Sequence, residues 1–295
     1  ENSDDISIED LIPREDVVVT VSHAGYIKRI AASEYRAQRR GGRGKVGATA
    51  REEDFIANIF VASTHDTILF FTSEGRVHWR KVHEIPQGAR ASRGKAIVNL
   101  LQLAPDEQIT AFLPVARFEE GRHVFFATQR GTVKKTELMA YSNRRAAGIV
   151  AIGLDEGDHL IGVRLVEQGQ EVLLSTRNGK AIRFAESDVR AMGRGAGGVR
   201  GISLEDDDQV VAVDILSPGR MILSVSERGQ GKCTELDEYR VTGRGGKGIF
   251  TMKVTDKTGA VMGIVQVSAD DELMLVTDRG RLIRIRVADI RVAGR

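Results

Sequence analysis

The chain has 295 residues, of which 41% are hydrophobic, with a single cysteine and a formal net charge of +2. No apolar stretch approaches the roughly 20 residues that a membrane-spanning helix needs, and one cysteine excludes an internal disulfide. We therefore expect a globular protein of a reducing cytoplasm, without a membrane partner.

The charge is distributed unevenly along the chain. Residues 1–16 hold seven acids and one base, so the remainder carries 42 bases against 34 acids, a net charge of +8. This asymmetry predicts an acidic linker over 1–16 and a basic domain over 17–295 with a polyanionic partner. A solubilising terminus explains the acidic leader equally well.

A β-rich run that ends in a tight glycine turn recurs six times. The first run, 17–21, leads into the turn and a return strand at 26–30. Successive turn glycines lie 50, 56, 48, 50 and 51 residues apart: Gly25, Gly75, Gly131, Gly179, Gly229 and Gly280. A period near fifty indicates one supersecondary unit repeated in a stack or a ring.

A second glycine follows each of the first five turns at a nearly fixed distance. The separations are 19, 19, 17, 19 and 19 residues, for Gly44, Gly94, Gly148, Gly198 and Gly248. The sixth repeat reaches Arg295 before its own second glycine. We therefore expect the last repeat to be truncated.

Each repeat contains about four strand-like runs and no sustained helical period. In the third repeat, two apolar runs, 149–154 and 160–165, follow the glycine-rich loop. Six units of four strands predict an all-β, propeller-like disc of six four-stranded blades, either flat or spiral. Aromatic residues at recurring positions are expected to pack in the blades: Tyr35, Tyr141, Tyr239, Trp79 and Phe184.

Two glycine-rich segments, 193–198 and 243–248, match the dinucleotide-binding pattern G-x-G-x-x-G. That site needs a helix after the motif to hold the pyrophosphate, whereas strand-like residues follow both segments. The six histidines are scattered and Cys233 has no cysteine partner, so no metal site is expected. We predict no cofactor in this chain.

Cations recur in register with the repeat. One set lies three and four residues after the turn glycine, on the return strand: Lys28, Arg29, Lys134, Lys135, Arg183, Lys232 and Arg284, with His78 in the second repeat. A second set lies in the loops: Arg90, Arg93, Lys95, Arg144, Arg145, Arg194, Arg200, Arg244 and Lys247. Equivalent positions in a ring face equivalent directions, so both sets are predicted to form a basic rim that binds duplex DNA. The scarcity of aromatic residues beside them disfavours a single-strand groove.

The loop of the first repeat is richer in cations than the others. Four cations and three glycines occur within eight residues: Gln38, Arg39, Arg40, Gly41, Gly42, Arg43, Gly44 and Lys45. Glycines let a backbone lie against phosphates, and arginine forks hold phosphates bidentately.

This loop resembles the gyrase box of the DNA gyrase A subunit family, and 19–29, 131–136 and 189–193 also resemble segments of that family. The resemblance implies a six-bladed β-pinwheel with strands exchanged between neighbouring blades. It also implies that the domain wraps duplex DNA with positive handedness, for which 38–45 is required.

The resemblance further implies a bacterial, chromosome-associated protein that works in a heterotetramer. Its partners there are the gyrase B subunit, together with the rest of the gyrase A subunit. The cleaving tyrosine and the elements that use ATP and Mg²⁺ are expected elsewhere, so the chain alone is expected to be monomeric and non-catalytic.

Three alternatives remain open. A topoisomerase IV-type C-terminal domain has a related pinwheel with a degenerate box, and a non-enzymatic propeller can scaffold protein partners. A propeller enzyme with a site in the central channel has no supporting motif. Salt-sensitive binding of duplex DNA separates a DNA-wrapping domain from a protein scaffold.

Overall fold

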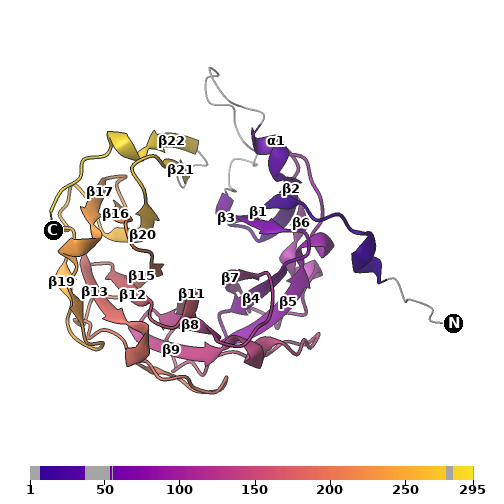
Figure 1. Ribbon diagram of the computed structural model, residues 1–295, viewed down its shortest axis with the longest axis horizontal. Helices are drawn as coiled ribbons and strands as arrows, with labels where there is room; N and C mark the ends of the chain where they lie inside the picture. The colour runs from indigo at the N-terminus through magenta and orange to yellow at the C-terminus, as the bar shows by residue number, and fades with distance from the viewer. Residues whose placement is uncertain (1–6, 37–53, 55, 277–281, 295) are drawn as a thin grey trace.

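Six small β-sheets follow one another in chain order around a central axis (Figure 1). The computed structural model describes residues 7–36, 54, 56–276 and 282–294. Every repeat contributes one antiparallel hairpin: β1 (Asp16–Ser22) with β2 (Tyr26–Ala31), β4 (Thr67–Thr72) with β5 (Arg76–Lys81), β8 (Arg122–Thr128) with β9 (Thr132–Glu137), β12 (Glu171–Thr176) with β13 (Lys180–Ala185), β16 (Met221–Ser226) with β17 (Gly231–Glu235), and β21 (Glu272–Val276) with β22 (Leu282–Arg286).

The first strand of each of the first five hairpins pairs with an inner strand from the same repeat. Figure 1 shows these inner strands facing the centre of the ring: β3 (Ile56–Ser63), β7 (Ile109–Val115), β11 (Leu160–Glu167), β15 (Val210–Leu216) and β20 (Val261–Val267). Each of these pairings is antiparallel and carries one register shift close to its end.

The outer strand of a blade comes from the next repeat. The second strand of each of the first four hairpins pairs with a two-residue strand that follows the next repeat's loop: β6 (Lys95–Ala96), β10 (Ile149–Val150), β14 (Val199–Arg200) and β19 (Ile249–Phe250). In blade 4, β18 (Val241–Thr242), which precedes that loop, pairs with the same hairpin strand. In blade 1, for example, Tyr26 lies opposite Ala96. The exchange of strands between neighbouring blades is therefore confirmed.

The number of blades differs from the expectation of six. Within the described residues, five sheets have three or more strands and are here called blades 1 to 5; the sixth sheet is the two-stranded hairpin β21–β22. Blades 1 to 3 have four strands, blade 4 has five and blade 5 has three. Because each outer strand is supplied by the following repeat, the last hairpins have fewer partners among the described residues.

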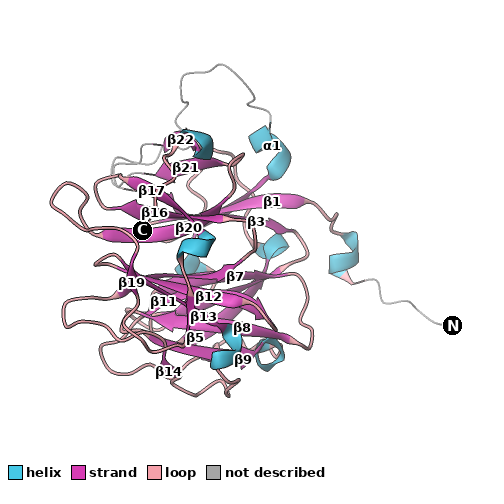
Figure 2. Ribbon diagram, turned by 60° about the vertical axis from the view of Figure 1, so that its left-hand side comes forward, coloured by secondary structure: helices cyan, strands magenta, loops and turns pink. Residues whose placement is uncertain are grey.

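Short helical turns follow the return strands, although no helix was predicted. They are α1 (Ala32–Arg36), η2 (Val82–Glu84), η4 (Leu138–Tyr141), η5 (Glu186–Asp188), η6 (Leu236–Glu238) and η7 (Val287–Asp289), with η1 (Ile8–Leu11) and η3 (Ile97–Asn99) elsewhere (Figure 2). At three to five residues each, they are too short to give a helical period. In the part of the chain that the structure describes, no helix has the length and apolarity to cross a membrane.

The cores lie between neighbouring blades. Phe71 of blade 2 meets Phe126 of blade 3 edge to face, with ring centroids 5.4 Å apart. Tyr141, Tyr239 and Phe184 are buried, as is Trp79, whose indole nitrogen donates to the Tyr141 carbonyl at 2.8 Å. The expected packing role of these four residues is confirmed, whereas the side chain of Tyr35 lies outside the described residues.

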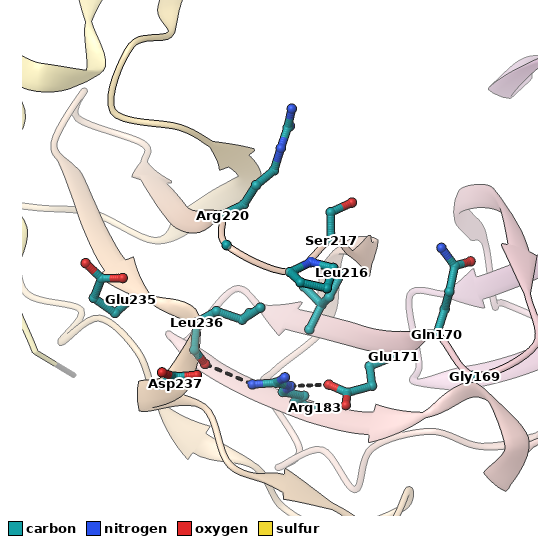
Figure 3. Close-up of a pocket in the computed structure, with 12 residues that line it drawn as sticks. Gly169, Gln170, Glu171, Arg183, Leu216, Ser217, Arg220, Glu235, Leu236 and Asp237 are labelled. Carbon is teal, nitrogen blue, oxygen red and sulfur yellow. Dashed lines mark hydrogen bonds and ion pairs between the residues drawn. The ribbon is translucent and has the colours of Figure 1, made fainter.

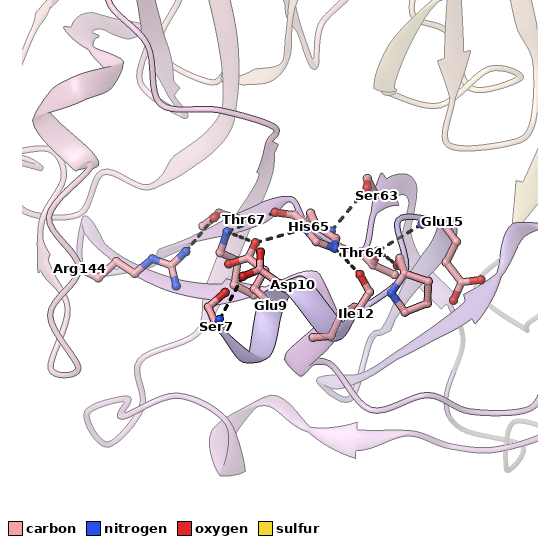
Figure 4. A network of polar contacts seen from close by, with 12 residues as sticks. Ser7, Glu9, Asp10, Ile12, Glu15, Ser63, Thr64, His65, Thr67 and Arg144 are labelled. Atoms are coloured by element: carbon pink, nitrogen blue, oxygen red, sulfur yellow. Dashed lines mark hydrogen bonds and ion pairs between the residues drawn. The ribbon is translucent and has the colours of Figure 1, made fainter. Parts of the chain in front are cut away.

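The described part of the acidic leader, 7–16, contacts the edge between blades 1 and 2 (Figure 4). The Glu9 carboxylate lies 3.0 Å from Lys81 Nζ and 3.4 Å from His65 Nδ1. The Lys81 ammonium lowers the pKa of Glu9. Thr64 Oγ1 donates to the Pro13 carbonyl at 2.7 Å. These contacts fix the direction in which the chain enters the ring.

The second glycine of the repeat is explained by strand exchange. Gly94, Gly148, Gly198 and Gly248 all have positive φ and directly precede an exchanged strand. At Gly198, with φ +99°, a Cβ would lie 2.3 Å from the Val133 carbonyl oxygen of the preceding blade. Only glycine combines the left-handed conformation with so close a backbone approach.

We predict that Gly198→Ala destabilises the protein by at least about 1–2 kcal/mol, because alanine is strained at positive φ and its Cβ meets backbone. Gly193→Ala is the matched control in the same loop, since a Cβ there has no heavy atom within 4 Å. Urea denaturation compares the two variants with the wild type. Equal midpoints for all three proteins would contradict this account of the second glycine.

Candidate nucleic-acid interface

The loop cations lie beside the exchanged strands, at the outer edge of the ring. Eight of the nine predicted loop cations are exposed: Arg93, Lys95, Arg144, Arg145, Arg194, Arg200, Arg244 and Lys247. The ninth, Arg90, is half-buried and donates to the Glu34 carbonyl. These nine residues, here called the rim cations, come from the loops of repeats two to five.

Several rim cations are held in place by neighbouring carbonyl and hydroxyl oxygens. Arg244 donates from Nε to the Asp188 carbonyl and from Nη1 to the Arg200 carbonyl, each at 3.0 Å. Arg144 donates to Thr67 Oγ1 at 2.9 Å. Such contacts use part of a guanidinium's five donors and leave the others available to an anion.

Three lysines of the return strands are bound by the protein itself. These residues, Lys28, Lys134 and Lys232, lie three positions after the turn glycine. Lys28 Nζ donates to the carbonyls of Ala89, Arg90 and Ser92 at 2.7–3.0 Å. Lys134 Nζ donates to the carbonyls of Ala151 and Arg194 at 2.7 and 2.5 Å, and Lys232 Nζ to Thr251 at 2.9 Å. Lys28 and Lys134 therefore tie their blades to the loop of the next repeat, whereas Lys134 and Lys232 also bind the segment that follows the exchanged strand of their own repeat.

The donors one position later bind the helical turn of the next repeat. Arg29 Nε donates to the Ile85 carbonyl at 2.8 Å, and Lys135 Nζ lies 2.6 Å from the Glu186 carboxylate. Arg183 donates to the carbonyls of Leu236 and Tyr239 at 3.0 and 2.8 Å. These contacts give the return-strand cations a structural role, which a sequence without its fold does not reveal.

Contact between DNA and the return-strand cations stays a prediction. Lys134 is fully buried, and Lys28 and Lys135 are 5% and 7% exposed. The exposed surface available to phosphates belongs instead to the rim cations. The gyrase-box residues Gln38–Lys45 and the side chain of Arg284 lie outside the described residues.

Blade 2 has His78 at the position of these lysines. Its side chain is buried, and its Nε2 lies 4.0 Å from the Glu107 carboxylate, beyond hydrogen-bonding distance. Burial lowers the pKa of His78, and the Glu107 carboxylate opposes this effect. In blade 2 the neighbouring Trp79, rather than His78, donates a hydrogen bond to the next repeat, at the Tyr141 carbonyl.

Acidic side chains occupy a different set of loops, which lead into the inner strands. Asp54, Asp158 and Asp208 each accept a hydrogen bond from a backbone N–H of a hairpin turn, at 2.9, 3.0 and 3.0 Å. In repeats three and four these aspartates lie at hairpin tips that also hold Arg130 and Arg177, whereas the loops at the outer edge carry the exposed rim cations. A polyanion is therefore attracted more to the outer edge than to the tips.

A pocket of about 390 Å³ lies between blades 4 and 5 (Figure 3). Its central cation, Arg183, contacts the Glu171 carboxylate at 2.5 Å and the Leu236 carbonyl at 3.0 Å. The contact with Leu236 links blade 4 to blade 5. The described residues that line the pocket include no nucleophile paired with a base. No group of three or more metal-binding side chains occurs among the described residues.

The buried Lys134 ammonium predicts a measurable pH effect on stability. Burial lowers the pKa of Lys134 to about 8, against about 10.4 in an unfolded chain. The unfolded state therefore binds the proton more tightly, and the cost of burying the charge is relieved as pH rises from 8 to 10. Relative to Lys134→Met, the wild type should gain unfolding free energy over this interval.

Urea denaturation of both proteins at pH 7.5, 8.5 and 9.5 measures this difference, and the other titrating groups cancel in the comparison. A difference that stays constant with pH would show that Lys134 keeps an ordinary pKa.

Comparisons with known proteins agree with this architecture. The family described as DNA gyrase C-terminal domain, beta-propeller, matches six successive segments: 16–63, 66–116, 122–167, 170–217, 220–268 and 271–295. Each segment corresponds to one repeat and begins at or just before the first strand of its hairpin.

Curated relatives cover the whole chain. It is 53% identical to the DNA gyrase A subunit of Salmonella typhimurium and 52% identical to that of Escherichia coli K12, over 294 residues in each case. It is 56% identical to the corresponding protein of Buchnera aphidicola subsp. Acyrthosiphon pisum over 295 residues. The chain spans about a third of the length of these relatives: 34%, 34% and 36%.

Two solved structures share the fold. The structure of a DNA gyrase A C-terminal domain aligns with a TM-score of 0.82 at 27% identity, over 95% of this chain and 92% of that one. The crystal structure of the C-terminal domain of a DNA topoisomerase IV aligns with a TM-score of 0.76 at 30% identity, over 96% and 87% of the two chains. With the six matched repeats, these likenesses show that the chain belongs to the DNA gyrase C-terminal domain family of β-propellers.

Proposed function

We propose that this chain binds duplex DNA along its outer edge and wraps it with positive handedness. The observation that carries the proposal is the succession of exposed cations beside the exchanged strands of consecutive blades. A curved row of cations, with some from each of four consecutive repeats, suits the regularly spaced phosphates of a bent duplex. The aspartates at the hairpin tips make those tips a weaker site for the same polyanion.

The physical task of this surface is to offset the cost of bending DNA. Smooth bending of a short site by 40–90° costs on the order of 1–6 kcal/mol. Many weak phosphate contacts supply that energy and release counterions at the same time. Carbonyl contacts such as those of Arg244 reduce the entropy lost when a guanidinium meets a phosphate.

In the parent protein, the wrap presents a DNA segment for strand passage, and ATP on the gyrase B subunit drives the introduction of negative supercoils. The partners are duplex DNA, the gyrase B subunit, and the rest of the gyrase A subunit, in a heterotetramer of the bacterial cytoplasm. By itself the chain is a non-catalytic monomer that holds no ATP or Mg²⁺. Residues 17–295 act as one domain, with 1–16 as the segment that joins it to the rest of the protein.

A topoisomerase IV-type role is the second candidate, because a C-terminal domain of that enzyme has a similar fold. The gyrase box would distinguish the two, and the loop from Gln38 to Lys45 resembles it here. A protein scaffold is the remaining alternative, and it requires no salt-sensitive binding of duplex DNA.

We predict that removing rim cations lowers the salt dependence of duplex binding. Each phosphate contact contributes about 0.9 to the slope of log K against log salt concentration. Arg144→Ala combined with Arg145→Ala should therefore lower the slope by up to about two, measured by fluorescence anisotropy on a labelled duplex. Arg117→Ala is the control, because Arg117 is exposed on the loop that joins β7 to β8, outside the loops that carry the rim cations.

Binding that is insensitive to salt would contradict the proposed DNA-wrapping function. A slope lowered equally by Arg117→Ala would show that the contacts are not confined to the outer edge.

The handedness of the wrap is tested by ligating nicked circular DNA in the presence of the chain. We expect a positive shift in linking number that increases with protein concentration, because DNA wrapped with positive handedness retains that writhe after ligation. Replacing Arg39, Arg40 and Arg43 with alanine should abolish the shift while leaving part of the duplex binding, which the rim cations supply.

Binding without any shift in the wild type would limit the function to unspecific DNA association. An unchanged shift in the triple variant would remove the gyrase box from the mechanism.

A further inference from the structure

At the outer edge of blade 1, an arginine lies on an aromatic ring. Tyr26 begins β2, and Arg93 directly precedes the second glycine of the next repeat. The guanidinium carbon of Arg93 lies 3.7 Å above the centroid of the Tyr26 ring. At this distance the planar guanidinium lies flat over the ring, because an edge-on group would drive its N–H hydrogens into the ring face. Its N–H donors therefore point away from the ring.

The backbone of Arg93 is held on both sides by blade 1. The carbonyl of Ser92 accepts a hydrogen bond from Lys28 Nζ at 2.7 Å. Gly94 has φ +83° and approaches β2 so closely that a Cβ there would lie 2.4 Å from the Ile27 carbonyl oxygen. The backbone and the side chain of Arg93 are therefore both held in place before any ligand binds.

The N–H donors of Arg93 are all available to a ligand. Arg93 is exposed, and within the described residues its side chain makes no hydrogen bond or ion pair. By contrast, Arg244 donates to two carbonyls, and Arg90 donates to the Glu34 carbonyl. Arg93 thus combines a fixed position with a full set of five donors. A guanidinium with free donors can hold a phosphate bidentately.

The equivalent positions of blades 2 to 4 lack such a pair. These positions correspond because the exchanged strands pair with the return strands in the same register. The residue before the second glycine carries no guanidinium in these blades: Ala147, Gly197 and Lys247. The residue after the turn glycine carries no aromatic ring: Arg76, Thr132 and Lys180. Among these four blades, only blade 1 therefore presents a guanidinium stacked on a ring.

We propose that Tyr26 positions Arg93, and that Arg93 thereby binds a phosphate of the duplex more tightly than the unstacked rim cations do. The inference rests on the proposed DNA-wrapping function and adds an anchor point to it, at blade 1. A side chain that is already ordered loses less conformational entropy when it binds. The half-buried Tyr26 lies beneath the guanidinium and acts through it, as a positioning residue.

Fluorescence anisotropy of the full chain on a labelled duplex, at several salt concentrations, tests the anchor. Arg93→Ala should weaken binding about tenfold at a fixed salt concentration, the order of one lost bidentate phosphate contact. It should also lower the salt slope by about 0.9. Arg194→Ala is the matched control, because Arg194 is an exposed loop cation on which no described ring stacks. It should lower the slope equally but weaken binding only about threefold.

Variants of Tyr26 separate positioning from a structural effect. Tyr26→Leu should weaken binding about two- to fivefold, the order of one exposed cation–π contact, and leave the salt slope unchanged because no charge is removed. Tyr26→Phe keeps the ring and should bind like the wild type. In the Arg93→Ala background, Tyr26→Leu should cause no further loss of affinity. Urea denaturation of each variant measures its effect on stability.

Three outcomes would overturn the inference. Wild-type affinity in Tyr26→Leu would show that the ring does not prepare Arg93 for binding. Equal losses of affinity in Arg93→Ala and Arg194→Ala would show that blade 1 holds no stronger anchor. A loss in Tyr26→Leu that is the same with and without Arg93 would assign Tyr26 to the stability of blade 1. Failure of the wild type to bind duplex DNA would instead refute the proposed function itself.

Discussion

The structure depends on the contact that each return strand makes with the next repeat. Its backbone pairs with the exchanged strand, and its side chains donate to the carbonyls that precede or follow that strand. Each blade is therefore completed by its neighbour and buries its polar groups only when the neighbour is present. The stability of the protein therefore depends on contacts between neighbouring repeats rather than on any single hairpin.

The same contact positions the candidate interface. A loop rich in arginine and glycine has little reason to hold one conformation by itself. Here Lys28 donates to three carbonyls of one such loop, and Lys134 donates to the carbonyl of Arg194. A buried ammonium is costly to desolvate, but its carbonyl partners recover part of that cost. In this way the buried lysines hold the loops that carry the exposed rim cations.

The separation of charge between the two kinds of loop gives the proposed function a direction. Carboxylates such as Asp158 and Asp208 stabilise the hairpin turns through backbone N–H groups. The exposed rim cations lie instead at the outer edge, which is why the proposed path of the duplex follows that edge. One arrangement of side chains therefore serves both the stability of the turns and the path of the ligand.

The sequence by itself determined the repeat, the β class, the burial of Tyr141 and Tyr239, and the family. These follow from local chemistry, because turns need glycine and strands need apolar alternation. Only the tertiary structure decided that five blades form within the described residues, and that Lys134 lies inside while Lys247 lies outside. The reason is strand exchange: the partners of a return strand lie in another repeat, so its own sequence cannot reveal which cations are buried.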